Sequence, residues 1–158
     1  MKNTIDINIS SVEIEYCHVK SNKLSGNTFK EVESKALLTF KEIKAKTKRT
    51  PYIRSKYYKN EKIFLNIFWS HLYQKHEKDR IRRLKFFNCA IELIQSTSKK
   101  PTTKPNPNKK NELLHRFGGK TKENQLFGGK TKENQLFLIQ IKENRSTKRK
   151  DLISIIPK

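Results

Sequence analysis

Residues 115–157 read HRFGGKTKENQLFGGKTKENQLFLIQIKENRSTKRKDLISIIP. Together with the few residues before them, they contain three short runs with the composition of β-strands, at 112–117, 137–143 and 150–156. In the second run Phe137, Ile139 and Ile141 lie two residues apart, a period that is typical of a strand with one buried face. Gly-Gly at 118–119 and Asn-Arg-Ser at 144–146 have the composition of chain reversals. The pattern predicts an antiparallel three-stranded meander.

A direct repeat lies inside this stretch. The sequence FGGKTKENQL at 117–126 recurs unchanged at 127–136. Repeats that build an array are longer and come in more copies, so we interpret the pair as a local duplication that lengthens the loop between the first two strands. Closure of a surface loop costs little more as the loop grows. Because the first copy is not followed by LIQI, it cannot replace the second strand, and we expect it to bulge outward.

Length and composition indicate a single modest domain. The chain has 158 residues, of which 34% are hydrophobic and 32% are charged. The core is therefore lean, but its aromatic and aliphatic residues are clustered, which argues against wholesale disorder. We expect an α+β fold with helices packed on a C-terminal antiparallel sheet. Residues 1–60 would supply an N-terminal extension and a first helix, and residues 61–158 the helical segment and the sheet, together one domain.

The formal charge of +21, from 36 Lys and Arg against 15 Asp and Glu, predicts a polyanionic partner. Self-repulsion of this size is relieved when a protein binds a polyanion. Nucleic acid is the leading candidate, an anionic membrane surface is the minor alternative, and no membrane partner is expected. No run approaches the roughly 18 apolar residues of a membrane span, and the first ten residues lack a signal peptide's apolar core. The two cysteines have no metal-type spacing, and a reduced cytoplasmic setting is expected.

The segments before the sheet show mixed signals. Alternation over 4–19 predicts a hairpin or an extended arm. Thr28 and Glu31 form a capping box at the start of an amphipathic helix that ends near residue 44. The basic segment 45–58 is either a solvated linker or a phosphate contact. Apolar stripes predict helices at 61–84 and 87–96, whereas three prolines within 96–110 predict a loop without regular structure.

A cationic patch lies within the first of these two helices. Lys75, Lys78 and Arg82 would share one helical face, with Arg80 and Arg83 beside it. Five cations outnumber the two nearby acids, which favours a phosphate-facing helix. A solvated face with local ion pairs is the equally weighted alternative.

Several kinds of chemistry are disfavoured by spacing. Gly-Lys-Thr at 119–121 and 129–131 resembles the end of a phosphate-binding loop, but the required earlier glycine is replaced by Leu114 and Asn124. The four histidines form no ligand-spaced cluster with carboxylates, and no Cys-His or Ser-His signature is present. We therefore expect neither a metal nor another cofactor.

Cleavage of RNA by its own 2′-hydroxyl needs only proton transfer and cations around the phosphorus. The C-terminal sheet offers suitable side chains, namely His115, Arg116, Lys120 or Lys130, Thr121 or Thr131, Gln140, Lys142, Lys150 and Ser154. His115 is either the proton-transfer group or a strand-end histidine without a task. Because His115 and Arg116 are neighbours, a regular strand directs them to opposite faces, and one site could use both only at a bulge or a strand end.

Four segments resemble a known group of proteins. They are FWSHLYQKHEKDRIRRLKFFNCAIELIQ at 68–95, PNPNKKNELLHRFGGKT at 105–121, LFLIQIKEN at 136–144 and KRKDLISIIP at 148–157. They resemble small phage- and mobile-element-associated toxin domains of the barnase/EndoU/colicin/RelE-like (BECR) ribonuclease superfamily. The resemblance covers most of 61–157. It implies helices on one face of an antiparallel sheet, and metal-independent RNA cleavage.

By that resemblance His115-Arg116, the threonine after Gly-Gly, Gln140 and Ser154 fall where such domains place site residues. We assign His115 as general acid or base, Arg116 and Lys150 as stabilisers of phosphate charge, and Thr131, Gln140 and Ser154 as hydrogen-bonding groups. Contacts to RNA are expected from Lys75, Lys78, Arg80, Arg82, Arg83, Lys120, Lys130 and Lys142.

The sequence thus predicts an RNA endonuclease, a toxin or mobile-element effector, with RNA and an antitoxin or immunity protein as expected partners. The alternatives are a basic nucleic-acid-binding protein without activity and a decayed copy, because the duplication departs from the family pattern beside the presumed site.

Overall fold

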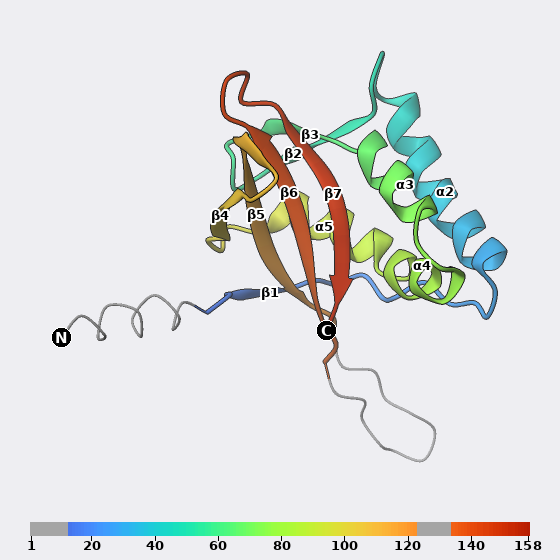
Figure 1. Ribbon diagram of the computed structural model, residues 1–158. Helices are drawn as coiled ribbons and strands as arrows, with labels where there is room; N and C mark the ends of the chain where they lie inside the picture. The colour runs from blue at the N-terminus through green and yellow to red at the C-terminus, as the bar shows by residue number, and fades with distance from the viewer. Residues whose placement is uncertain (1–12, 123–133) are drawn as a thin grey trace.

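A computed structural model describes residues 13–122 and 134–158 of the chain. Within these residues four helices accompany a curled mixed sheet of seven strands (Figure 1). The elements in chain order are β1 (Tyr16–His18), α2 (Phe29–Ala45), β2 (Tyr52–Ser55), β3 (Glu61–Phe64), α3 (Asn66–Tyr73), α4 (Glu77–Leu84), α5 (Phe87–Ser96), β4 (Thr102–Asn106), β5 (Lys109–Lys120), β6 (Leu136–Asn144) and β7 (Lys150–Pro157). The expected α+β class is confirmed.

The expected meander forms the centre of the sheet. Strands β5 and β6 pair antiparallel, as do β6 and β7. The Asn144 side chain accepts hydrogen bonds from the backbone N–H groups of Ser146 and Thr147 at 2.9 and 3.0 Å, which closes the predicted reversal at 144–146. The other predicted reversal is wrong, because Gly118 and Gly119 lie inside β5 and pair with β6.

The sheet is wider than the meander, and it is mixed rather than purely antiparallel. The strand order is β1-β5-β6-β7-β3-β2, with β4 paired to the other end of β5. Strand β1 runs parallel to β5, and β3 runs parallel to β7. The described part of the predicted N-terminal arm is therefore a short strand, and elements from before residue 61 belong to the same sheet as the meander.

Three segments differ from their predicted structure. Residues 61–64 form β3 rather than the first turn of a helix, because a short apolar run fits either period and pairing with β2 and β7 decides between them. The predicted helix 61–84 also breaks between α3 and α4. The supposed connectors 45–58 and 96–110 contain β2 and β4. Strand β4 accommodates Pro105 because it is an edge strand, where a missing N–H breaks no ladder.

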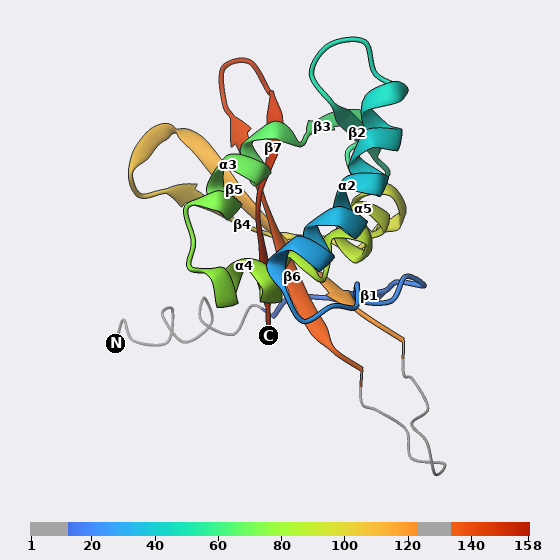
Figure 2. The ribbon, with the colours of Figure 1, turned by 90° about the vertical axis from the view of Figure 1, so that its right-hand side faces the viewer.

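Two predicted helices are confirmed. Helix α2 begins after Thr28, whose hydroxyl oxygen accepts the backbone N–H of Glu31 at 3.2 Å. Helix α5 begins at Phe87 and packs behind the meander (Figures 1 and 2). Large side chains buried between these layers include Phe68, Phe87, Phe137, Ile139 and Leu152. The opposite face of the meander, which we call the open face, is not covered by any helix of the described residues (Figure 1).

The duplicated decapeptide is divided between two strands. Phe117–Lys120 of the first copy belong to β5, so this half of the copy does not bulge, and Leu136 of the second copy begins β6. The rest of the predicted bulge, at 123–133, lies outside the described residues. Thr121 and Gln135 close the hairpin, because the backbone N–H of Thr121 donates to the Gln135 carbonyl at 2.9 Å and the backbone N–H of Gln135 donates to the Thr121 hydroxyl at 3.1 Å.

Deletion of 123–132 is therefore expected to leave the fold intact. The remaining sequence would join Thr121 to Gln135 through three residues, Lys122, Glu133 and Asn134, which is a common hairpin loop length. A shorter loop closes at a lower entropic cost, so the free energy of unfolding should stay equal or rise by about 1 kcal/mol. Thermal unfolding monitored by circular dichroism measures this change in the free energy of unfolding. A loss of the folded state would show that the second copy is structurally required.

The N-terminal segment is tethered to α5 by one carboxylate. Glu92 accepts the backbone N–H groups of Lys20 and Ser21 at 2.6 and 2.9 Å, and the Ser21 hydroxyl at 2.7 Å. Burial by itself would raise the pKa of the Glu92 carboxyl, but these hydrogen bonds lower that pKa below its usual value.

Replacing Glu92 with glutamine should therefore destabilise the protein by about 1–3 kcal/mol at neutral pH. A lowered folded-state pKa contributes stability that is present above the unfolded-state pKa and is lost as pH falls through the folded-state value. The difference between wild type and Glu92→Gln in urea unfolding should accordingly shrink below about pH 4. A difference that is constant with pH would show that the carboxylate charge is not what matters.

Candidate active site

A row of polar side chains crosses the open face of the sheet. Arg116, Gln140 and Ser154 are directly opposite one another on β5, β6 and β7, so they share one face. The Arg116 Nε–H donates to Gln140 Oε1 at 2.7 Å. At the other end of the row, Arg83 of α4 donates to Ser154 Oγ at 2.9 Å. The predicted meeting of Arg116, Gln140 and Ser154 thus occurs, with Arg83 added to it.

Arg83 is held in place by its surroundings. Its Nε–H donates to Asp79 at 3.0 Å. Its Nη1 also donates to the Ile155 carbonyl at 2.7 Å, in the part of β7 that does not pair with β3. Burial alone would raise the pKa of the Asp79 carboxyl, but hydrogen bonds and positive charge from Arg83 and Arg82 lower it below its usual value. The ion pair therefore persists at neutral pH and fixes one end of the row.

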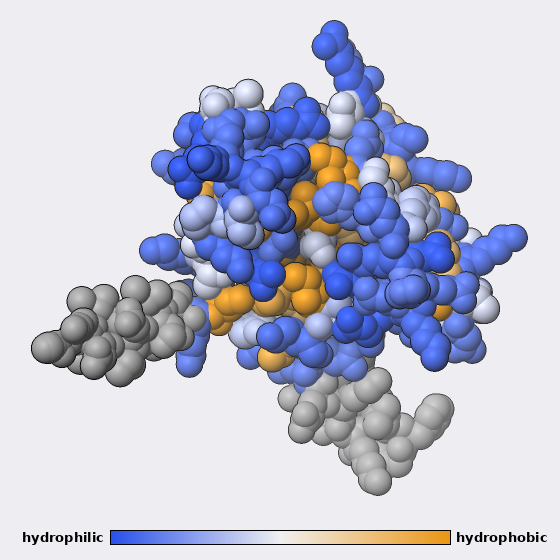
Figure 3. Space-filling model, viewed as in Figure 1, coloured by the Kyte–Doolittle hydropathy of each residue, from blue (hydrophilic) through white to orange (hydrophobic). Residues whose placement is uncertain are grey.

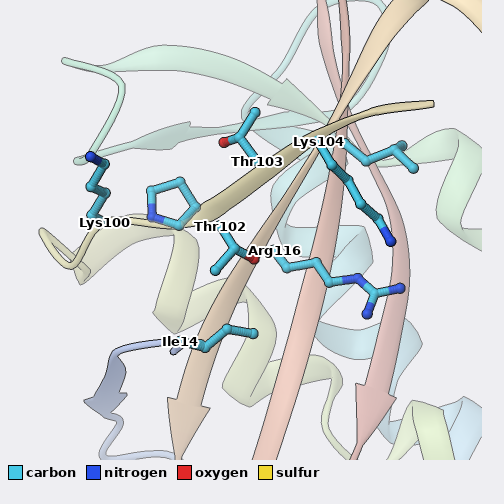
Figure 4. A pocket seen from close by; sticks show the side chains of 8 residues that line it. Ile14, Lys100, Thr102, Thr103, Lys104 and Arg116 are labelled. Atoms are coloured by element: carbon cyan, nitrogen blue, oxygen red, sulfur yellow. The ribbon is translucent and has the colours of Figure 1, made fainter. Parts of the chain in front are cut away.

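A pocket of about 580 Å³ adjoins the other end of the row. Its lining residues are Ile14, Lys100, Pro101, Thr102, Thr103, Lys104, Leu114 and Arg116. Three of them are cations and none is a carboxylate. The side chains of Lys104 and Arg116 extend in the same direction over the sheet (Figure 4), and hydrophobic residues are exposed between hydrophilic ones on this side of the molecule (Figure 3). The pocket therefore presents positive charge beside apolar surface.

The Arg116 guanidinium is suited to a phosphate group. Only its Nε takes part in a hydrogen bond within the described residues, which leaves both Nη groups for a ligand. A planar guanidinium offers paired donors that match two phosphate oxygens. Gln140 orients the group, and the Lys104 ammonium and Ser154 hydroxyl supply further donors. The arrangement can bind a phosphodiester and stabilise negative charge that develops on it.

His115 and Lys150 do not belong to this site, because they lie on the helix-covered face. The His115 residue is 6% exposed, and its imidazole is paired through Nδ1 with the Thr103 hydroxyl and through Nε2 with Glu143, both at 2.7 Å. Lys150 is 4% exposed, and its ammonium lies 2.6 Å from Glu61 and 3.8 Å from Glu143. A regular β5 separates His115 from Arg116, so the predicted pairing of these two neighbours in one site is not met.

Tyr58 completes the buried cluster around His115. Its ring packs edge-on against the imidazole at 5.6 Å and lies under the Lys150 ammonium at 4.6 Å. Burial, followed by the charge of Glu143, raises the pKa of the Tyr58 hydroxyl above its ordinary value. The cluster pairs its charges internally and joins the β2–β3 turn to the meander, which is a structural role.

The remaining predicted residues are dispersed. Lys130 and Thr131 lie outside the described residues. Lys120 and Lys142 are on the open face, and the Lys142 ammonium lies 3.7 Å from Glu112. Thr121 is buried in the hairpin closure.

The five predicted cations do not share one helical face, because Lys75 lies before α4 and Arg80 and Arg83 turn toward the protein. The alternative of a solvated face with local ion pairs fits Lys78 and Arg82. Arg80 packs over the Phe29 ring at 4.9 Å, and Arg83 faces the sheet. Arg82 is exposed and pairs with Asp79, and Lys78 is exposed. Only Arg83 of this group reaches the candidate site.

Sequence reasoning missed Lys100, Thr102 and Lys104 as site residues. They were assigned to a loop because of the prolines. The paired β-branched residues Thr102 and Thr103 before a proline are a signal for an edge strand that could have placed them.

Comparison of the chain with protein-family models, curated proteins and solved structures found no significant match. The described residues contain no group of three His, Cys, Asp or Glu side chains that could hold a metal ion. No helix in the described part of the chain is long and apolar enough to pass through a bilayer.

Proposed function

We propose that the protein is an endoribonuclease that cleaves RNA by attack of the 2′-hydroxyl, without a metal ion, on the open face of its sheet. The observation that carries the proposal is the row of Arg116, Gln140 and Ser154, which register places side by side next to a cationic pocket. A meander with helices on one face and an open opposite face also supports the resemblance to BECR toxins. An antitoxin or immunity protein that covers the open face would be the matching partner.

In this mechanism the 2′-oxygen attacks the phosphorus while its proton passes to water, and the bond to the 5′-oxygen breaks. Arg116 binds the phosphate oxygens as negative charge grows on them, and Ser154 contributes a further hydrogen bond. Lys104, one of the two lysines that line the pocket, supplies an ammonium group that can protonate the leaving 5′-oxygen. Positioning and charge stabilisation thus supply most of the acceleration.

The proposal is tested with end-labelled RNA incubated in excess chelator. Cleavage should continue and should leave 2′,3′-cyclic phosphate ends together with 5′-hydroxyl ends. A matched substrate with 2′-O-methyl groups should resist cleavage, because it lacks the attacking hydroxyl. Intact RNA after incubation with folded protein, or 5′-phosphate ends on the products, would contradict the mechanism.

Binding without catalysis is a second candidate, favoured by the absence of an imidazole from the row of Arg116, Gln140 and Ser154. His115 is buried on the other face, and the exposed His18 is opposite Lys120 at the far end of β5, so the row itself offers cations and donors but no imidazole. This alternative predicts RNA affinity that falls steeply with salt and no new RNA ends.

A further inference from the structure

A second cationic pocket lies at the opposite end of the sheet from β4. Its volume is about 580 Å³, and its lining residues are Lys46, Lys48, Arg49, Thr50, Tyr52, Lys62, Phe64 and Arg149. Five of these residues are cations and none is a carboxylate. The lining comes from the segment after α2, the β2–β3 hairpin and the residue before β7. We call this surface the hairpin pocket.

Two aromatic rings form the floor of the hairpin pocket. Tyr52 and Phe64 face each other across β2 and β3 with ring centroids 6.0 Å apart, and both are half-buried. The Lys62 ammonium lies 4.7 Å from the Tyr52 ring centroid, and the Arg149 guanidinium lies 4.1 Å from that of Phe64. The rings are therefore partly exposed and bordered by positive charge.

Most of this charge is not neutralised by the protein. Among the described residues, Lys46, Lys48, Arg49 and Lys62 form no ion pair. Arg149 pairs with the buried carboxylate of Asp151 at 3.2 Å, which fixes its guanidinium over Phe64. Such a group of unpaired cations is self-repulsive unless an anionic ligand binds.

The hairpin pocket shares a face with the candidate active site. One row of directly opposite residues runs from β4 to β2 through Lys104, Leu114, Lys142, Asp151, Phe64 and Tyr52. Residues opposite one another in a sheet lie on the same face, and this row adjoins that of Arg116. Phe64 is two strands from Lys142, or about 10 Å at the usual strand spacing, and Gln140 lies two residues further along β6, which makes its distance from Phe64 about 12 Å. An extended nucleic-acid strand bound at Arg116 can thus reach the two rings.

We propose that the hairpin pocket binds single-stranded RNA, with an unpaired base stacked on the Tyr52 ring beside Phe64 and backbone phosphates held by Lys46, Lys48, Arg49 and Lys62. Aromatic platforms bordered by cations bind single strands because every base has a face that can stack, whereas bases in a duplex are already stacked on each other. The inference rests on the proposed function in taking RNA as the ligand, and it adds that the substrate is unpaired next to the cleaved bond.

The test is fluorescence anisotropy with a labelled 2′-O-methyl oligoribonucleotide, which can bind but cannot be cleaved by its 2′-oxygen. Wild type should bind the single strand at least tenfold more tightly than the corresponding duplex. Tyr52→Leu should weaken binding by roughly 5- to 100-fold, whereas Tyr52→Phe should bind like wild type. Circular dichroism establishes that each variant is folded.

The cations are tested by salt dependence. Lys48→Ala with Arg49→Ala should reduce the slope of log affinity against log salt by about 1.4, or about 0.7 for each lost phosphate contact. The matched control, Lys30→Ala with Lys41→Ala, removes the same charge from exposed positions on α2 and should leave the slope unchanged. Equal slopes for the two pairs, or unchanged affinity of Tyr52→Leu, would overturn the inference even if the protein cleaves RNA. If wild type cleaves no RNA but Tyr52→Leu still binds RNA more weakly than wild type, the inference is supported and the proposed activity is ruled out.

Discussion

Replacing Arg116 with alanine is expected to slow RNA cleavage by roughly 10²- to 10³-fold, the usual effect of removing one donor that stabilises transition-state charge. Arg116 is on the open face and its Nη groups have no hydrogen-bond partner among the described residues, so its truncation should cost little stability. Arg116→Lys keeps the charge but loses the paired donors, and it should recover only part of the rate. Single-turnover cleavage with saturating protein separates this effect from weaker binding.

His115 supplies the control for this experiment. Because the imidazole is buried between Thr103 and Glu143 on the other face, His115→Gln should lower the unfolding temperature while the cleavage rate of the folded protein stays within a few-fold of wild type. A loss of rate in folded His115→Gln as large as that in Arg116→Ala would move the site to the helix-covered face.

Gly119→Val is expected to prevent folding. A Cβ atom at residue 119 would lie 2.6 and 2.8 Å from two ring carbons of Phe137 and closer still to a third. That ring cannot move aside, because it is fully buried and stacked on Phe86 with centroids 5.0 Å apart. Overpacking of an interior site typically costs 1–3 kcal/mol, and a contact with this much overlap should exceed that range and use up much of a small domain's stability.

Lys120→Val is the matched control for the glycine variant. It introduces the same β-branched side chain at the next position of β5, which is only half-buried. Far-UV circular dichroism and thermal unfolding should show a native-like protein for Lys120→Val and none for Gly119→Val. A stable Gly119→Val protein would mean that Phe137 can repack and that the end of β5 is not as tightly held as described.

The parts of the fold that the sequence predicts well are those determined by local patterns. Alternation in Phe137–Ile141 is enough to predict β6, and the Thr28–Glu31 capping box predicts the start of α2. Strands β2, β3 and β4 contain only four or five residues each and form by pairing with distant segments. Residues 61–64, for example, become a strand because β2 and β7 flank them.

The same distinction applies to the site. The side chains of Arg116, Gln140 and Ser154 could be predicted together because alternation assigns them to one face of adjacent strands. The burial of Lys150 could not, because Glu61 is 89 residues away in the chain. The alignment of Tyr52 and Phe64 with Asp151 likewise depends on the register of β3 against β7, which no local pattern contains.

Binding of RNA to the open face is tested most directly by nuclear magnetic resonance of ¹⁵N-labelled protein. The protein is titrated with a 2′-deoxy dinucleotide, which lacks the attacking hydroxyl. The side-chain signals of Arg116 Nε and the Gln140 amide, and the backbone signal of Ser154, should shift together with a single dissociation constant, while the His115 ring signals stay in place. Shifts at His115 and Lys150 with no change at Arg116 and Gln140 would contradict binding on the open face.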